Sequence, residues 1–329
     1  MDALSPIPNL PELERVLRLV EASRNFGNLI RVSTLATVQA GGHDYPIHGI
    51  VMGPEDKTLP TLGIVGGVHG LERVGSHLVL AYFDSLFEQL QWDKDLQEKL
   101  QQVRIVSVPL VNPAGMHMGR RSNPQGVDLM RNAPIDSVSK PAFLLGGHRF
   151  SKSLPWFRGP EGSPMEVESQ ALCDFVRAEV FPSRASLVLD MHSGFGSDDR
   201  LWYPYARTTA PFPRLRQVEK LTSLLNLSFP NHIYTVEPQS LSYTTHGDLW
   251  DYLFDEHYAQ SGADGPVFIP WTLEMGSWIW VRKNPLQLFS ALGPFNPIKA
   301  HRHKRTMRRH LPLVDFFLRA VKNYEAWAK

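Results

Sequence analysis

Residues 61–72 read TLGIVGGVHGLE, and this stretch decides the fold. Its first eight residues, 61–68, form a short apolar run that is typical of a strand buried on both faces of a sheet. The polar residues His69 and Glu72 follow directly, and a helical pattern then covers residues 73–91. A buried strand, a polar turn and a helix form the repeating unit of an α/β protein.

Similar units recur along the chain. The sequence predicts a hairpin over residues 30–52, further strands over 103–111, 187–189 and 267–273, and further helices over 10–24 and 165–177. Strands that alternate with helices imply a sheet that is covered on both faces. We therefore expect an α/β fold, more specifically a single-domain α/β/α sandwich around a central mixed, mostly parallel twisted sheet.

No linker or internal repeat divides the chain, so we expect one domain over residues 1–329. Residues 111–162 are rich in Asn, Pro, Gly, Arg and Ser and show little periodicity. A long irregular stretch inside a compact domain is usually functional or disordered. Since parallel sheets bind ligands at the carboxyl ends of their strands, we expect functional residues there and in this stretch.

Composition excludes several classes of protein. The 34 Lys and Arg residues balance 33 Asp and Glu residues, which argues against binding to nucleic acid or a membrane surface through bulk charge. No segment approaches the roughly 20 apolar residues of a membrane span. The single cysteine, Cys173, excludes an internal disulfide and a cysteine-rich zinc site. With no secretory signal at the N-terminus, we expect a cytoplasmic protein whose metal ligands, if any, are His, Asp and Glu.

Three residues at strand ends are candidate metal ligands. His69 and Glu72 lie three apart where a strand turns into a helix, and His192 ends another buried strand. Imidazole and carboxylate suit zinc, and three protein ligands leave a position open for catalysis. Asp190 is a candidate for the carboxylate that orients an imidazole. The alternatives are a surface pair at a helix start and a core histidine bonded to the backbone.

Two further features place charged side chains at the predicted carboxyl edge of the sheet. Residues 120–132 read RRSNPQGVDLMRN, and arginine forks bind carboxylates and neutralise oxyanions, although a solvated basic loop is the alternative. Glu274 ends an apolar strand before Gly276. A buried carboxylate is usually partnered or part of a site, and burial favours a general base by raising its pKa.

Taken in order, these pieces resemble the zinc metallocarboxypeptidases. The resemblance rests on HxxE at 69–72, NPxG at 112–115, GVDLxRN at 126–132, His-Ser at 192–193 and the late Glu274. It covers roughly residues 30–280. The resemblance implies a bacterial cytoplasmic-type member, and we expect no pro-segment. It implies a zinc carboxypeptidase-like fold, one zinc ion per chain and an enzyme that cleaves a C-terminal amide bond.

The resemblance also assigns roles to individual residues. His69, Glu72 and His192 are expected to hold zinc, and Glu274 to act as general base on a zinc-activated water. Arg121 matches the arginine that stabilises the oxyanion, with its neighbour Arg120 as the alternative. The residues expected to bind substrate are Arg131, Asn132 and Tyr243, together with Arg120.

One departure from the family pattern leaves more than one substrate class possible. The family has Asn before the carboxylate-gripping Arg131, but here Met130 stands there, and a thioether donates no hydrogen bond. Trp250, counted along the flap from Tyr243, is expected to line the side-chain pocket. The expected partner is a peptide or acyl-amino acid with a free carboxylate, and the oligomeric state is not predicted.

Two rival functions remain. An amidase or deacylase of the desuccinylase or murein-peptide amidase kind would keep the zinc and change the substrate. The presence of a GVDLxRN loop at 126–132 favours the peptidase over the desuccinylase. A zinc-binding module without catalysis is the rival from another class, and the intact Glu274 and arginine sites argue against it.

Overall fold

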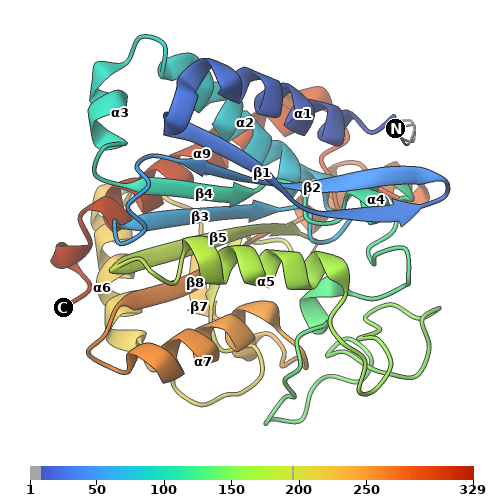
Figure 1. Cartoon of the computed structure of the whole chain (residues 1–329). Coiled ribbons are helices and arrows are strands. Elements are labelled where there is room, and N and C mark those ends of the chain that lie inside the picture. The colour runs from blue at the N-terminus through green and yellow to red at the C-terminus, as the bar shows by residue number, and fades with distance from the viewer. Residues whose placement is uncertain (1–8, 195) are drawn as a thin grey trace.

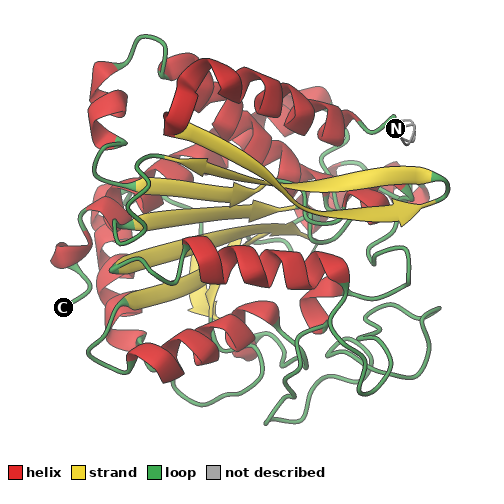
Figure 2. Ribbon diagram, in the orientation of Figure 1, coloured by secondary structure: helices red, strands yellow, loops and turns green. Residues whose placement is uncertain are grey.

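The computed structural model describes residues 9–194 and 196–329, and these form one eight-stranded sheet with helices on both sides (Figures 1 and 2). The predicted α/β class is confirmed. The strands are β1 (Ile30–Ala40), β2 (His43–Met52), β3 (Thr61–Gly66), β4 (Arg104–Val108), β5 (Ala185–Ser193), β6 (Arg200–Tyr203), β7 (Thr235–Pro238) and β8 (Val267–Met275).

The helices surround this sheet. They are α1 (Pro11–Ser23), α2 (Arg73–Gln89), α3 (Lys94–Lys99), α4 (Pro113–His117), α5 (Val167–Glu179), α6 (Leu215–Ser228), α7 (Leu249–Ser261), α8 (Trp278–Lys283) and α9 (Ala300–Lys322). Short 3₁₀ helices are η1 (Arg24–Leu29), η2 (Leu129–Arg131), η3 (Gln239–Leu241), η4 (Pro285–Phe289) and η5 (Tyr324–Ala326).

The sheet is mixed, in the order β1-β2-β4-β3-β5-β8-β6-β7. Its centre, β4-β3-β5-β8, is parallel, whereas β1 and β2 form the predicted hairpin and β2 runs antiparallel to β4. At the other edge β6 is antiparallel to β8 and parallel to β7. The prediction of a mostly parallel sheet is therefore confirmed for the central strands.

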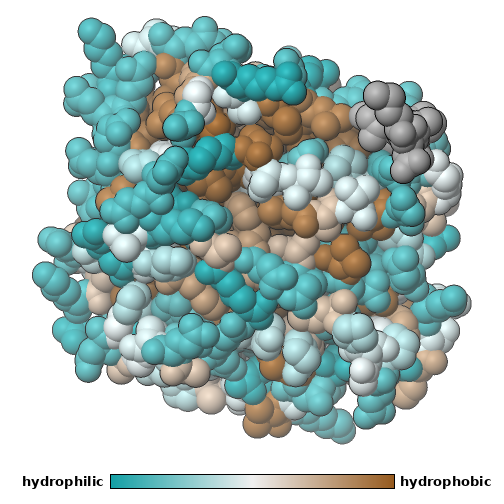
Figure 3. All heavy atoms as spheres, in the orientation of Figure 1, coloured by the Kyte–Doolittle hydropathy of each residue, from teal (hydrophilic) through white to brown (hydrophobic). Residues whose placement is uncertain are grey.

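Every residue of β3, β4 and β5 is buried because helices cover both faces of the sheet. Helices α2 and α9 pack on β3 and β5, while α5 packs against β1 and α7 against β8 (Figure 1). Hydrophilic residues cover most of the face in Figure 3, with hydrophobic atoms visible between α1 and the sheet. Within the described ranges, no helix has both the length and the apolar character needed to span a membrane.

Helix α2 begins in close contact with β5. A Cβ atom built on Gly75 would lie 2.3 Å from the carbonyl oxygen of Met191, so glycine is required for this approach. Glu72 precedes α2 and His192 follows Met191, so the contact brings these two side chains together. The side chain of Asn296 fixes the same turn, since it accepts from the Val74 amide and donates to the Leu71 carbonyl.

Replacing Gly75 by Ala should therefore damage both the fold and the site. The added methyl group forces α2 away from β5, and overpacking of this kind costs about 1–3 kcal/mol of unfolding free energy. Urea denaturation measures this cost, and chelator competition should show weaker zinc binding. Glu88→Ala is the control, because this exposed residue lies on the same helix and its truncation does not press α2 against β5; equal zinc affinity in the two variants would contradict the prediction.

Candidate metal centre and catalytic cavity

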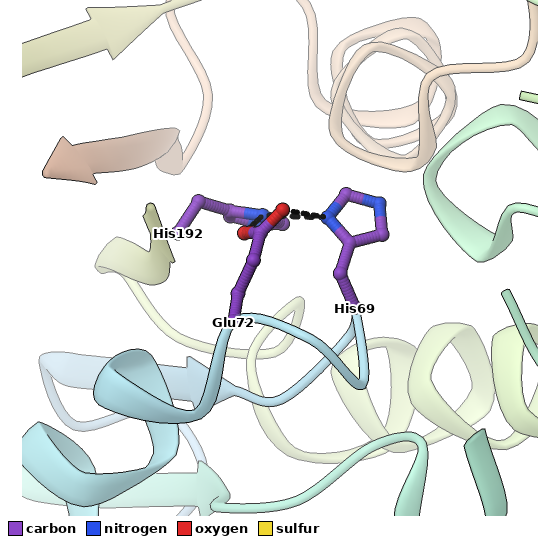
Figure 4. Close-up of side chains that lie close together, drawn as sticks. All are labelled: His69, Glu72 and His192. Carbon is purple, nitrogen blue, oxygen red and sulfur yellow. Dashed lines mark hydrogen bonds and ion pairs between the residues drawn. The ribbon is translucent and has the colours of Figure 1, made fainter. Parts of the chain in front are cut away.

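His69, Glu72 and His192 converge at the carboxyl ends of β3 and β5. Figure 4 shows the three side chains pointing toward one another, His69 and Glu72 from the turn after β3 and His192 from the end of strand β5. Each offers a ligand atom within 4.8 Å of the others, and all three are buried. The Nδ1 of His69 lies 3.0 Å from Glu72 Oε1, and the Nδ1 of His192 lies 3.1 Å from Glu72 Oε2.

Two buried aspartates orient the imidazoles. His69 Nε2 lies 3.0 Å from Asp128 Oδ1, and His192 Nε2 lies 2.8 Å from Asp190 Oδ2. A carboxylate accepts a hydrogen bond from Nε2, so each ring turns its Nδ1 toward the cluster and, as a metal ligand, would offer the Nδ1 lone pair there. The two Nδ1 atoms lie only 3.2 Å apart, beside a carboxylate. This donor set of two nitrogens and one oxygen fits zinc, with a coordination position left open.

The charges around this cluster are compensated. Burial would raise the pKa of Glu72, but His69, His192 and Arg121 outweigh burial and hold it well below its usual range. Burial likewise opposes a charge on His192, yet Asp190 and Glu72 raise the pKa of His192 well above its usual value. The carboxylates that favour positive charge on His192 also favour a metal cation among these three side chains.

Asp190 links the metal centre to α7. The indole nitrogen of Trp250 donates to Asp190 Oδ2 at 2.8 Å, on the same oxygen that His192 contacts. The expected orienting role of Asp190 therefore agrees with its position. The expectation for Trp250 is wrong, because its indole is buried under the metal centre and does not line the cavity. The separation of Trp250 from Tyr243 in the sequence could not show this, because α7 begins at Leu249 and directs the Trp250 side chain toward β5.

A cavity of about 140 Å³ opens on the metal cluster. Arg121, Arg131, Tyr243 and Glu274 line it, as does Met130. Glu274 pairs in register with His192 across β5 and β8, which places the two side chains next to each other at the carboxyl edge. The structure thus brings four of the expected catalytic and substrate-binding residues to the three metal ligands.

Arg121 is held in one orientation by two carboxylates. Its Nε donates to Asp128 Oδ2 at 2.9 Å and its Nη1 to Glu72 Oε1 at 2.8 Å. Burial would raise the pKa of Asp128, but Arg121 and His69 outweigh it and hold that pKa well below its usual range. Arg120, the alternative, is exposed and lies outside this cavity.

Arg131 and Tyr243 meet on another wall. The Arg131 guanidinium lies 5.9 Å from the centre of the Tyr243 ring, and Arg131 Nε is buried without a hydrogen-bond partner in the described structure. Burial raises the pKa of the Tyr243 hydroxyl, and the Glu274 charge adds to this effect. The phenol therefore keeps its proton at neutral pH and can donate a hydrogen bond.

Asn132 was expected to bind substrate, but its side chain bonds to the protein backbone. Its amide nitrogen donates to the Arg158 carbonyl at 3.1 Å, and its amide oxygen accepts from the Glu166 backbone at 2.6 Å. Both ends of the amide are thus used within the protein, and the residue does not line the cavity. The geometry supports a role in holding the loop that carries Arg131.

Some cavity residues were not identified from the sequence. They include Leu145, Trp156, Trp202, Gln239, Asp248, Thr272 and Phe295. Thr272 had a usable signal, because it lies two residues before Glu274 on β8 and so shares its face of the sheet. Leu145 and Trp156 come from the irregular stretch that was expected to be functional, which has no periodicity to show which side chains turn inward.

The NPxG motif supports the metal centre from outside. Asn112 accepts from the Gly115 amide at 2.8 Å and donates to the Val68 carbonyl at 3.3 Å. A Cβ on Gly70 would lie 2.4 Å from the backbone of Gly115. The two motifs therefore pack backbone to backbone, which fixes the turn that carries His69.

Loss of the Asp190 contact should weaken zinc binding. In Asp190→Asn the amide no longer presents a carboxylate to His192, and Trp250→Phe removes the indole donor that holds Asp190. Loss of such an outer partner typically costs about 10- to 100-fold in metal affinity. Chelator competition measures this affinity, with Trp92→Phe as the exposed control. Wild-type zinc affinity in Asp190→Asn would disprove the positioning role.

Sequence comparison finds relatives that are named carboxypeptidases. The chain is 29% identical over 119 residues to carboxypeptidase E of Caenorhabditis elegans, a stretch that covers 32% of this chain and 25% of that protein. It is 27% identical over 107 residues to carboxypeptidase SOL1 of Arabidopsis thaliana, covering 32% of this chain and 22% of that protein. The match thus spans about a quarter of each relative's length.

Structure comparison finds the same fold. Thrombin activatable fibrinolysis inhibitor superposes with a TM-score of 0.68 at 18% identity, covering 94% of this chain and 74% of that one. Carboxypeptidase A from Helicoverpa armigera gives 0.64 at 19% identity, covering 94% and 71%. A metallo-carboxypeptidase from Pseudomonas aeruginosa gives 0.58 at 16% identity, covering 94% and 68%. Since the zinc carboxypeptidase family model matches residues 21–276, the chain belongs to the zinc carboxypeptidase family.

Proposed function

We propose that the protein is a zinc-dependent hydrolase that cleaves the amide bond before a free C-terminal carboxylate. One observation carries the proposal: a single cavity combines the three metal ligands with Glu274, Arg121 and Arg131. This set provides a metal position, a base, a cation for an oxyanion and a cation for a carboxylate. These are the groups that metal-assisted hydrolysis of a peptide C-terminus requires.

Glu274 is the proposed proton carrier. When zinc is bound, it polarises the scissile carbonyl and lowers the pKa of water. Glu274 takes the proton from the attacking water and passes it to the nitrogen of the leaving amine. Its position beside His192 on the neighbouring strand supports this role, because the base then lies next to the metal position.

Arg121 is the proposed partner of the developing oxyanion. Glu72 and Asp128 fix its guanidinium at the cavity wall, so little reorganisation is needed when the oxyanion forms. Arg120 is not suited to this role from its exposed position outside the cavity.

Arg131 and Tyr243 are proposed to bind the terminal carboxylate. The buried and unpaired Nε of Arg131 is a donor that a carboxylate would satisfy, and the Tyr243 phenol supplies a second one. Asn132 supports them indirectly by bonding to the backbone at Arg158 and Glu166.

Met130 favours an amidase or deacylase as the second candidate. Its side chain lines the cavity next to Arg131, where a thioether provides no hydrogen bond to a carboxylate. A substrate with a different group at this place, such as an acyl-amino acid or a cell-wall peptide, would retain the metal chemistry. The two candidates differ in the leaving group that the cavity accepts.

The wider setting is part of the same proposal. We propose that residues 1–329 act as one catalytic domain in a reducing compartment such as the cytoplasm. The support for this location is that the chain has a single cysteine, Cys173, and so forms no internal disulfide. The substrate is proposed to be a peptide or acyl-amino acid, not a nucleic acid or a membrane.

Replacing Glu274 by Gln should abolish turnover and leave zinc in place. The amide keeps the shape of the side chain but accepts no proton, and loss of general-base catalysis typically lowers kcat by about 100- to 10,000-fold. A hydrolysis assay with model dipeptides gives the rate, and metal analysis gives the zinc content. Activity close to that of the wild type in Glu274→Gln would exclude the mechanism, and a zinc-loaded wild type without turnover on any substrate would favour a binding module.

Replacing Met130 by Asn should separate the two candidate substrates. The amide would add a donor beside Arg131, so a peptidase should show a lower KM for peptides with a free carboxylate, by about five- to tenfold. Met130→Leu is the control that adds no donor. The assay compares peptides, acyl-amino acids and peptidoglycan fragments. A wild type that cleaves only acyl-amino acids, with Met130→Asn impairing this activity, would support the deacylase.

A further inference from the structure

A second and larger groove lies beside the catalytic cavity. Its volume is about 540 Å³ against about 140 Å³, and Arg121 and Trp156 line both spaces. Arg120, Gln125 and Lys152 form its polar side, and Leu71 and Leu154 are among its apolar residues. We refer to it as the acyl-side groove.

The shared residues define how a substrate would enter this groove. Arg131 and Tyr243 line the cavity but not the groove, whereas Arg121 lies between the two spaces. A peptide whose terminal carboxylate lies at Arg131 and whose scissile carbonyl lies at Arg121 continues on its acyl side past these shared walls. The acyl portion of the substrate therefore lies in the groove.

The groove is cationic although the chain as a whole is nearly neutral. Residues 117–127 and 137–160, which supply most of its walls, contain no Asp or Glu. Arg120 and Lys152 are exposed, and neither forms an ion pair with any residue in the ranges that the structure covers. Asp128 also borders the groove, but it is fully buried and its charge is balanced by Arg121 and His69.

We propose that the acyl-side groove is a subsite for a carboxylate on the acyl side of the scissile amide. Arg120 and Lys152 bind the carboxylate, and Leu71, Leu154 and Trp156 contact the apolar part of the acyl chain. This inference rests on the proposed hydrolysis for the direction of the substrate, and it adds a substrate class: acidic peptides or acyl groups. Arg120 thus becomes a specificity residue distinct from the oxyanion-binding Arg121.

Binding of matched peptides tests the subsite without turnover. Four-residue peptides that differ only in having Asp, Asn or Lys two positions before the C-terminal residue are titrated into zinc-loaded Glu274→Gln protein. The expected order of affinity is Asp, then Asn, then Lys, with about a fivefold difference at each step in low salt. Because the cations are exposed, about 0.5 M NaCl should reduce these differences to less than twofold.

Charge-removing variants locate the effect. The double variant Arg120→Gln, Lys152→Gln should bring the ratio of the Asp and Asn affinities close to one, and each single variant should lower it in part. Lys140→Gln is the matched control, because this exposed lysine lies on the same irregular stretch and lines neither space. It should keep the wild-type ratio.

The outcomes separate this inference from the proposed function. Equal affinity for the three peptides, no binding of any of them, or a ratio that survives the double variant would overturn the subsite. If wild-type protein binds the Asp peptide with the expected preference but hydrolyses none of the series, the subsite is upheld and the proposed hydrolysis is wrong. Hydrolysis of all three peptides at equal kcat/KM, together with equal affinities, would leave the function standing without the subsite.

Discussion

The metal centre depends on two buried carboxylates that the metal would not contact. Asp128 and Asp190 bind the Nε2 atoms of His69 and His192, and thereby turn both Nδ1 lone pairs toward one point beside Glu72. Two nitrogen lone pairs and a carboxylate at this spacing repel one another unless a cation lies between them. The same two hydrogen bonds that orient the ligands therefore favour a cation, such as a metal ion, at this point.

The fold is arranged to provide these carboxylates with partners. Burying a carboxylate without hydrogen bonds is energetically unfavourable. Each aspartate therefore accepts hydrogen bonds from donors in a different part of the chain. Asp128 accepts from Arg121 and from the Met130 amide, while Asp190 accepts from Trp250 on α7. Helix α7, the arginine loop and the two parallel strands are thus joined at the metal position. Movement of any one of them disturbs a ligand.

The sequence was informative where function depends on short separations. His69 and Glu72 lie in one turn, and His192 and Glu274 both end buried strands, so strand patterns were enough to place them at one edge of a sheet. The general α/β class followed from the same alternation. Strands β6 and β7 were not predicted, since four residues each are too few to show a period.

The sequence was uninformative where side-chain direction depends on distant packing. Trp250 was expected in the substrate pocket by counting along the flap, yet the start of α7 turns its indole toward Asp190. Position in the sequence alone could not decide whether Arg120 or Arg121 is the oxyanion partner. The structure distinguishes them, because only Arg121 is held in the cavity wall by hydrogen bonds to Glu72 and Asp128. Asn132 likewise looked like a substrate contact until both ends of its amide were found on the backbone.

The near-zero net charge conceals a separation of charge along the path of the substrate. Acidic groups gather at the metal position, where Asp128, Asp190 and Glu72 are buried and paired. Basic groups line the cavity at Arg121 and Arg131 and the adjoining groove at Arg120, and Glu274 and Asp248 line the cavity with them. Asp128 and Asp190 orient the two imidazoles, and Asp128 and Glu72 hold Arg121. Because each sign of charge is gathered at its own place, a chain with net charge +1 combines a site for a cation with arginines that, on the proposed function, would bind a carboxylate and an oxyanion.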